Sequence, residues 1–125
     1  MNAATKEALL AMTRDAYAQG EAMLRSFSGS DQADSELYFG LARVYRTVAL
    51  GFDTEEALAI EDARWRAYAA EQARRVEAAP KIKRGPSSGH SAISHRWVSP
   101  DAFAAHMPHA RQMIATAMAR GEGST

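Results

Sequence analysis

The chain lacks cysteine, long apolar runs and any sustained strand-like alternation. Without cysteine there are no disulfides, thiolate metal ligands or thiol nucleophiles, and the composition suits a reducing compartment. No run approaches the roughly 20 apolar residues that a membrane span needs. Because Glu7 and Asp15 interrupt the apolar N-terminal residues, we expect no signal peptide and a cytoplasmic location.

Acidic residues are missing from one segment, residues 78–100, which carries four Lys or Arg residues and a net charge of +4. Residues 1–77 hold 13 acidic and 9 basic residues, a net charge of −4, and the whole chain is neutral. Such uneven charge bears on partners, or on docking of the basic segment onto the acidic body of the same chain, rather than on fold. At 125 residues and 46% hydrophobic content, the chain is expected to form a single globular domain with one core.

Apolar residues recur at helical spacing along four segments. The expected helices span residues 5–27, 34–50, 54–78 and 99–120. In the first, Leu10, Tyr17 and Leu24 repeat every seven residues, beside a second line of Leu9, Ala16 and Met23. In the second, the stripe consists of Leu37, Leu41, Val44, Tyr45 and Val48. The pattern therefore predicts an all-α fold, an antiparallel helical bundle of three to four helices.

Turn and breaker residues predict the boundaries of these helices. Gly51 suits a left-handed C-terminal cap, and Asp53 suits the start of the next helix. Pro108 lies inside the last helix and predicts a kink or a split there. Beyond Tyr68 the third helix has only alanines and Val76 as apolar residues, so its last turns are expected to project from the core or to pack against something small.

The expected organisation has four parts within one domain. Residues 1–79 form a three-helix body, 80–98 a long basic Gly/Ser linker or binding loop, 99–120 the C-terminal helix and 121–125 a disordered tail. A connection of this length without its own secondary structure is often functional or disordered.

Basic and aromatic residues around the acid-free segment form the first candidate site. Such side chains bind phosphate backbones, stack on bases, or anchor protein interfaces. The candidate residues are Arg74, Arg75, Lys81, Lys83, Arg84, Arg96 and Trp97. The chain as a whole is not basic, and its GPSSGH stretch lacks the Gly-Lys-Ser/Thr ending of a nucleotide-binding P-loop.

Histidines form the second candidate. His90, His95, His106 and His109 lie within twenty residues of one another and could ligate zinc or nickel. No metal-binding template such as HExxH is present, and surface or capping roles explain the same residues.

Catalytic and DNA-reading patterns have weaker support. Serines lie near His90 and His95, but no GxSxG elbow occurs to hold a nucleophile. Glu61 and Asp62 are expected on a charged helix surface, where Asp62 can pair with Arg66. A helix-turn-helix across Gly51 would bring acidic residues towards phosphates, the wrong charge for reading DNA.

The sequence thus favours a small non-enzymatic protein that binds another protein or protein complex stoichiometrically, as a regulator, inhibitor or adaptor. The alternative is binding to an RNA or DNA backbone through residues 74–97, and the second alternative is a histidine-based metal site. We expect no cofactor and no membrane association. The sequence does not indicate an oligomeric state.

Overall fold

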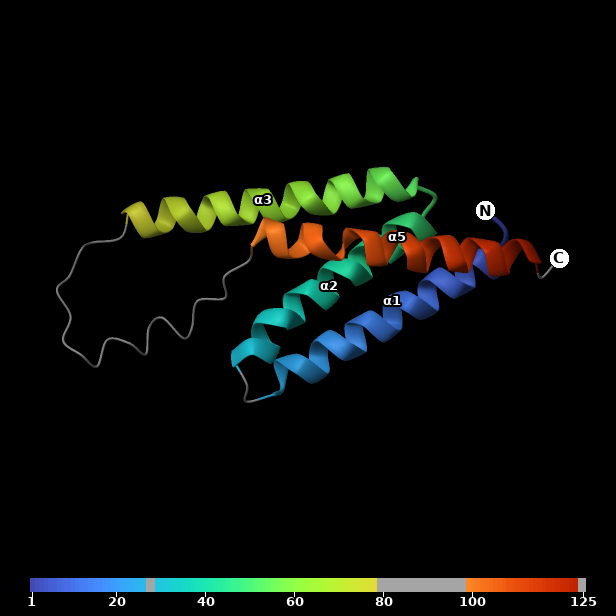
Figure 1. Cartoon of the computed structure of the whole chain (residues 1–125), viewed down its shortest axis with the longest axis horizontal. Coiled ribbons are helices and arrows are strands. Elements are labelled where there is room, and N and C mark those ends of the chain that lie inside the picture. The colour runs from blue at the N-terminus through green and yellow to red at the C-terminus, as the bar shows by residue number, and fades with distance from the viewer. Residues whose placement is uncertain (27–28, 79–98, 124–125) are drawn as a thin grey trace.

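The computed structural model describes residues 1–26, 29–78 and 99–123. These residues form four helices and no strand: α1 (Ala3–Leu24), α2 (Gly29–Ala49), α3 (Thr54–Ala78) and α5 (Pro100–Gly123). Figure 1 shows their arrangement as a bundle. The predicted all-α helical bundle is confirmed, while the basic loop expected at residues 80–98 lies outside the described residues.

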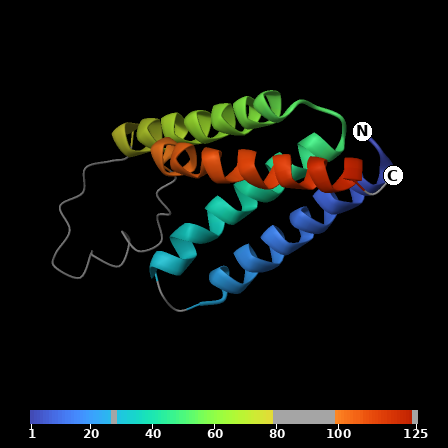
Figure 2. The ribbon, with the colours of Figure 1, turned by 45° about the vertical axis from the view of Figure 1, so that its right-hand side comes forward.

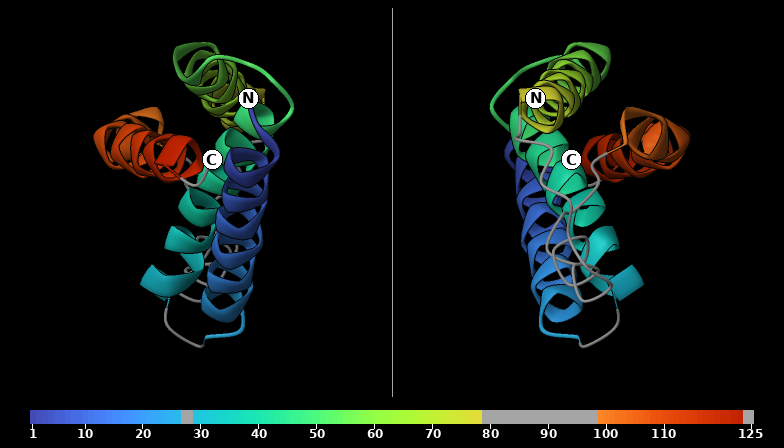
Figure 3. Two further views of the ribbon diagram at one scale, coloured as in Figure 1. Left: turned by 90° about the vertical axis from the view of Figure 1, so that its right-hand side faces the viewer. Right: turned by 90° about the vertical axis from the view of Figure 1, so that its left-hand side faces the viewer.

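Helices α1 and α2 form an antiparallel pair, seen side by side in Figures 2 and 3. The innermost line of α1 combines Leu9 and Ala16, which the sequence pattern placed on the apolar face, with small residues that the pattern missed. These small residues are Thr5, Thr13 and Gly20. A Cβ on Gly20 would lie 2.6 Å from Cε1 of Phe39, so a larger residue at this position would force the Phe39 ring to shift.

Helix α2 packs against α1, α3 and α5, and α5 likewise packs against the three other helices. Its predicted stripe, Leu37, Leu41, Val44, Tyr45 and Val48, is buried in full. Helix α5 contributes Phe103, Ala110, Ile114 and Ala117 to the same core. The first three helices and the C-terminal helix therefore share one hydrophobic interior.

The turn between α2 and α3 forms as predicted. Gly51 has a φ of 113°, a left-handed conformation that favours glycine. Its N–H donates to the Val48 carbonyl at 2.9 Å, and the Phe52 N–H donates to the Thr47 carbonyl at 3.4 Å. This pair of bonds is a Schellman motif, and it lets α3 begin at Thr54 as predicted.

Helix α2 begins earlier than its predicted start at residue 34. The expected helix bounds leave Gly29-Ser30-Asp31 between two helices, yet this stretch lies in the first turn of α2. Serine and aspartate favour both turns and helix N-termini, so local composition does not separate the two.

Helix α5 is one helix from Pro100 to Gly123, so the split predicted at Pro108 does not occur. Pro108 is exposed, whereas Phe103 and Ala110 on either side of it are buried. Packing on both sides of the proline therefore compensates for the hydrogen bond that it cannot donate.

The end of α5 also extends beyond its predicted limit at residue 120. The Asn2 side-chain amide donates to the Gly121 carbonyl at 2.9 Å. A Cβ on Gly121 would lie 1.7 Å from the Thr5 hydroxyl oxygen, so glycine is required where α1 and α5 meet. This contact orders part of the predicted tail, and residues 124–125 lie outside the described residues.

Candidate functional site

The predicted binding residues divide into two groups. Arg74 and Arg75 lie on the exposed end of α3. The others, Lys81, Lys83, Arg84, Arg96 and Trp97, lie outside the described residues, as do His90 and His95. Within the part of the chain that the structure describes, the candidate site is therefore the C-terminal half of α3 and the contacts that hold it.

Helix α3 consists of two halves with different surroundings. The first half buries Ala57, Leu58, Glu61 and Trp65. No residue from 66 to 78 is buried, and Figure 1 shows this half extending beyond the start of α5. The predicted projection of the last turns is confirmed. We call residues 66–78 the α3 arm; at ~1.5 Å per residue it is roughly 20 Å long.

A buried ion pair fixes the base of the arm. Glu61 is only 2% exposed, and Arg43 Nε of α2 donates to both of its carboxylate oxygens at 3.0 Å. Arg43 Nη2 donates to Glu61 Oε2 at 2.7 Å, and Trp65 Nε1 donates to the same oxygen at 2.9 Å. Burial acts to lower the pKa of Arg43, but the hydrogen bond and charge of Glu61 outweigh it, so the pKa is raised. Bidentate, charge-assisted bonds of this kind fix orientation as well as contributing energy.

This arrangement corrects the expectation that Glu61 lies on a charged surface. Glu61 shares a helix face with Leu58 and Trp65, three residues before it and four after it. An acid flanked in this way by apolar residues is the signal that indicates burial. Asp62, by contrast, pairs with Arg66 at 2.8 Å as predicted.

An aromatic stack joins the base of the arm to α5. The rings of Trp65 and Phe103 are stacked, with centroids 5.1 Å apart and an interplanar angle of 23°. A Cβ on Gly40 of α2 would lie 3.1 Å from Trp65 Nε1 and 3.3 Å from Phe103 Cε1. The absence of a side chain at Gly40 therefore lets both rings pack against α2, and α2 and α5 together hold α3 where its arm begins.

The arm itself is charged and partly apolar. Arg75 Nε lies 3.1 Å from Glu71 Oε1, and Arg74 pairs with the same carboxylate. Tyr68 is 46% exposed and Val76 is 60% exposed. These two side chains continue the helix face that carries Glu61 and Trp65 in the core, since the positions follow at helical spacing.

The two described histidines have separate surroundings. Nδ1 of His106 lies 2.9 Å from the Ala102 carbonyl oxygen of its own helix, and His109 is exposed. Among the described residues, no group of three or more His, Asp or Glu side chains is placed to hold a metal ion. The structure thus gives His106 a structural contact, consistent with the capping or surface alternative.

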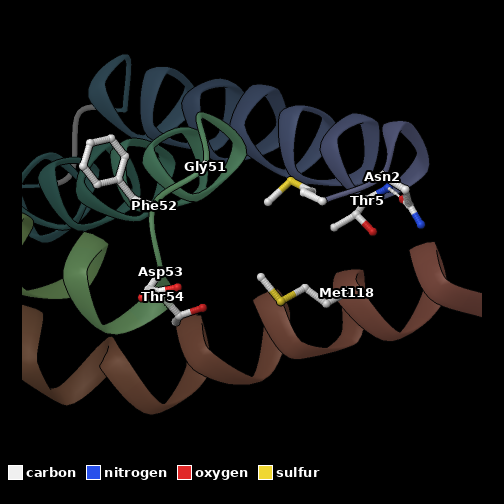
Figure 4. Close-up of a pocket in the computed structure, with 8 residues that line it drawn as sticks. Asn2, Thr5, Gly51, Phe52, Asp53, Thr54 and Met118 are labelled. Atoms are coloured by element: carbon white, nitrogen blue, oxygen red, sulfur yellow. Dashed lines mark hydrogen bonds between the residues drawn. The ribbon is translucent and has the colours of Figure 1, made fainter.

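A cavity of about 460 Å³ lies at the end of the bundle where both termini meet the α2–α3 turn. Figure 4 shows Asp53 and Thr54 on one side, Asn2 and Thr5 on the other, and Met118 between them. Asn2 already has a structural role, because its side-chain oxygen accepts from the Thr5 N–H at 2.8 Å and so caps α1. The polar groups here serve the helix termini and do not converge on one point.

The chain matches no protein-family model, no curated protein and no solved structure. None of the helices in the described ranges has both the length and the hydropathy to cross a membrane. The observations that bear on function therefore come from the structure alone. They are the exposed, amphipathic α3 arm and the buried contacts at its base.

Proposed function

We propose that this protein acts by stoichiometric binding to another protein, as a regulator, inhibitor or adaptor, and that the α3 arm is its docking surface. The observation that carries the proposal is the continuity of one helix face. The face that is buried at Glu61 and Trp65 continues to Tyr68 and Val76, which are exposed.

The energetics of a lone helix support this proposal. A helical segment as short as the arm is marginal in water without tertiary packing. Its ion pairs to Glu71 are exposed, and exposed pairs contribute only about 0–1 kcal/mol. A partner groove that covered Tyr68 and Val76 would supply the missing burial, in the manner of helix-in-groove recognition.

The base of the arm favours such docking because it is rigid. Arg43, Glu61 and Trp65 form a hydrogen-bonded set that spans α2 and α3, and Trp65 stacks on Phe103 of α5. A surface held in one orientation before binding loses less conformational entropy on association. The direction in which the arm leaves the core would therefore be set before the partner binds.

Charge on the arm favours a protein partner over nucleic acid. The arm carries three arginines and two glutamates, a net charge of +1. Arg74 and Arg75 both pair with Glu71, so contact with phosphates would have to compete with these pairs. Binding to an RNA or DNA backbone through residues 74–97 is the alternative that the same experiment tests.

The test is affinity capture from the source cell with the full chain as bait. We expect Tyr68→Ala to weaken capture about tenfold or more, since a tyrosine anchor of this kind typically contributes 2 kcal/mol or more. Ile60→Ala is the matched control, because Ile60 is 45% exposed on the same helix but lies outside the arm. Helical circular dichroism should be unchanged in both variants.

Nuclease and salt distinguish the two partner classes. A protein partner should remain bound after nuclease treatment. Binding that disappears with nuclease and falls steeply with salt would support the nucleic-acid alternative, and Lys81→Ala, Lys83→Ala and Arg84→Ala should then abolish it. If Trp97 contributes a second anchor, Trp97→Ala should weaken protein capture while leaving the circular dichroism unchanged.

A further inference from the structure

A second cavity, of about 290 Å³, lies between α1, α2 and α5 and shares no lining residue with the α3 arm. Its apolar lining includes Met12, Leu41 and Met113. An adjoining cavity of about 380 Å³ shares Met12, Asp15 and Met113 with it. The volume is near the lower end of small-molecule sites, and the mixture of an apolar lining with a few polar groups is typical of them.

Tyr45 and Asp15 are two of the polar groups that line this cavity, and neither has a hydrogen-bond or ion-pair partner among the described residues. Tyr45 is only 3% exposed, and no described residue forms a hydrogen bond with its hydroxyl. Burial raises the pKa of Tyr45. The hydroxyl oxygen is not among the fully buried unpaired atoms of the described residues, so it is open to the cavity and is a candidate ligand contact.

The second such group is Asp15, at the rim. It forms no ion pair or hydrogen bond with any described residue, and it is the only Asp, Glu, Lys or Arg that lines the 290 Å³ cavity. A carboxylate in this position disfavours anions and attracts a positive charge.

We propose that this cavity binds a small organic cation with an apolar body. Asp15 provides the opposite charge, and the Tyr45 hydroxyl accepts a hydrogen bond from the ligand N–H. The ring of Tyr38, which also lines the cavity, offers a face to the cation. Met12 and Met113 are flexible and can adapt to the apolar body. The proposal is independent of the function proposed for the arm.

The test compares two probes of nearly equal shape by nuclear magnetic resonance of the methionine methyl groups. Phenethylamine is a cation, and 2-phenylethanol is its neutral counterpart. The titrations are run at about pH 8, well above the ordinary pKa of an imidazole, which is about 6.5. We expect phenethylamine to shift the Met12 and Met113 methyl signals and to bind about threefold more tightly than the alcohol, as an exposed charge pair would provide.

Variants test the assigned roles. Asp15→Asn should remove the preference for the amine, and Tyr45→Phe should weaken amine binding. Asp53→Asn, which changes an acid at the other cavity, should leave binding unchanged. Equal affinity for the two probes, an unaltered preference in Asp15→Asn, or no shift at Met12 and Met113 would overturn the proposal.

Discussion

Both halves of α3 contain a glutamate that pairs with arginine, but the pair is buried in the first half and exposed in the second. In the first half, Glu61 is buried and receives hydrogen bonds from Arg43 and Trp65. In the second half, Glu71 pairs with Arg74 and Arg75 at the surface, where the arginine side chains are 75% and 71% exposed. Helix α3 is therefore one continuous helix that is stabilised in two different ways. Contacts with other helices stabilise its first half, and only contacts within the helix stabilise its second half.

The largest expected loss of stability comes from removing the aromatic stack that holds the first half of α3. Trp65→Ala should lower the free energy of unfolding by roughly 4 kcal/mol, because it leaves a cavity against Phe103 and Gly40. Urea denaturation followed by circular dichroism measures this loss. A loss no larger than that of Tyr68→Ala would mean that the two halves do not differ as described.

Removing the buried acid should have the next largest effect. Glu61→Ala should cost about 3 kcal/mol, because the half-buried guanidinium of Arg43 and the indole N–H of Trp65 lose their acceptor. Glu61→Gln retains an acceptor and should cost less. Equal losses in Glu61→Ala and Glu61→Gln, measured by urea denaturation, would contradict this role for the carboxylate.

The same substitution in the arm should have little effect on stability. Glu71→Ala breaks the pairs with Arg74 and Arg75, and it should change the free energy of unfolding by less than about 1 kcal/mol, since both arginines remain hydrated. The comparison between Glu61→Ala and Glu71→Ala isolates burial from charge pairing. A large loss in Glu71→Ala would show that the arm takes part in global folding.

The smallest expected effect on stability comes from an exposed ion pair at the start of α3. Arg111 of α5 donates to both carboxylate oxygens of Glu55 at 2.9 and 3.0 Å, and this hydrogen bond lowers the pKa of Glu55. A lowered pKa adds stability that is present above the ordinary carboxyl value and is lost as pH falls through the folded value. Carboxyl titration by nuclear magnetic resonance should show the pKa of Glu55 rising in Arg111→Ala; an unchanged pKa would contradict the pairing.

The sequence was sufficient for those features of the fold that depend on local chemistry. The bounds of α3, the left-handed turn at Gly51 and the buried stripe of α2 follow from periodicity and turn residues. The projection of the arm followed from the scarcity of apolar residues after Tyr68. These features can be assigned without knowing which helices contact one another.

Features that depend on distant partners were missed. Glu61 looked like a surface acid because Arg43, its partner, lies 18 residues earlier on another helix. Gly121 looked like part of a frayed tail because Thr5 and Asn2, which pack against it, are at the other end of the sequence. Periodicity assigns faces to helices, but it does not show which polar or small residue meets a complementary neighbour.

The exposure of Arg74 and Arg75 was predictable from the same local pattern, whereas the cavity at Asp15 and Tyr45 was not. Three helices form that cavity, so no single stretch of sequence carries its signature. The remaining predicted binding residues, from Lys81 to Trp97, lie outside the described residues and stay a prediction.

Amide hydrogen exchange along α3, in the free protein and in the complex recovered by capture, tests the central claim most directly. In the free protein, amides of residues 66–78 should exchange much faster than those of residues 57–65, because only the earlier residues share the stability of the core. In the complex, residues 66–78 should become protected. Equal protection of both halves in the free chain, or an arm whose exchange the partner leaves unchanged, would contradict the account.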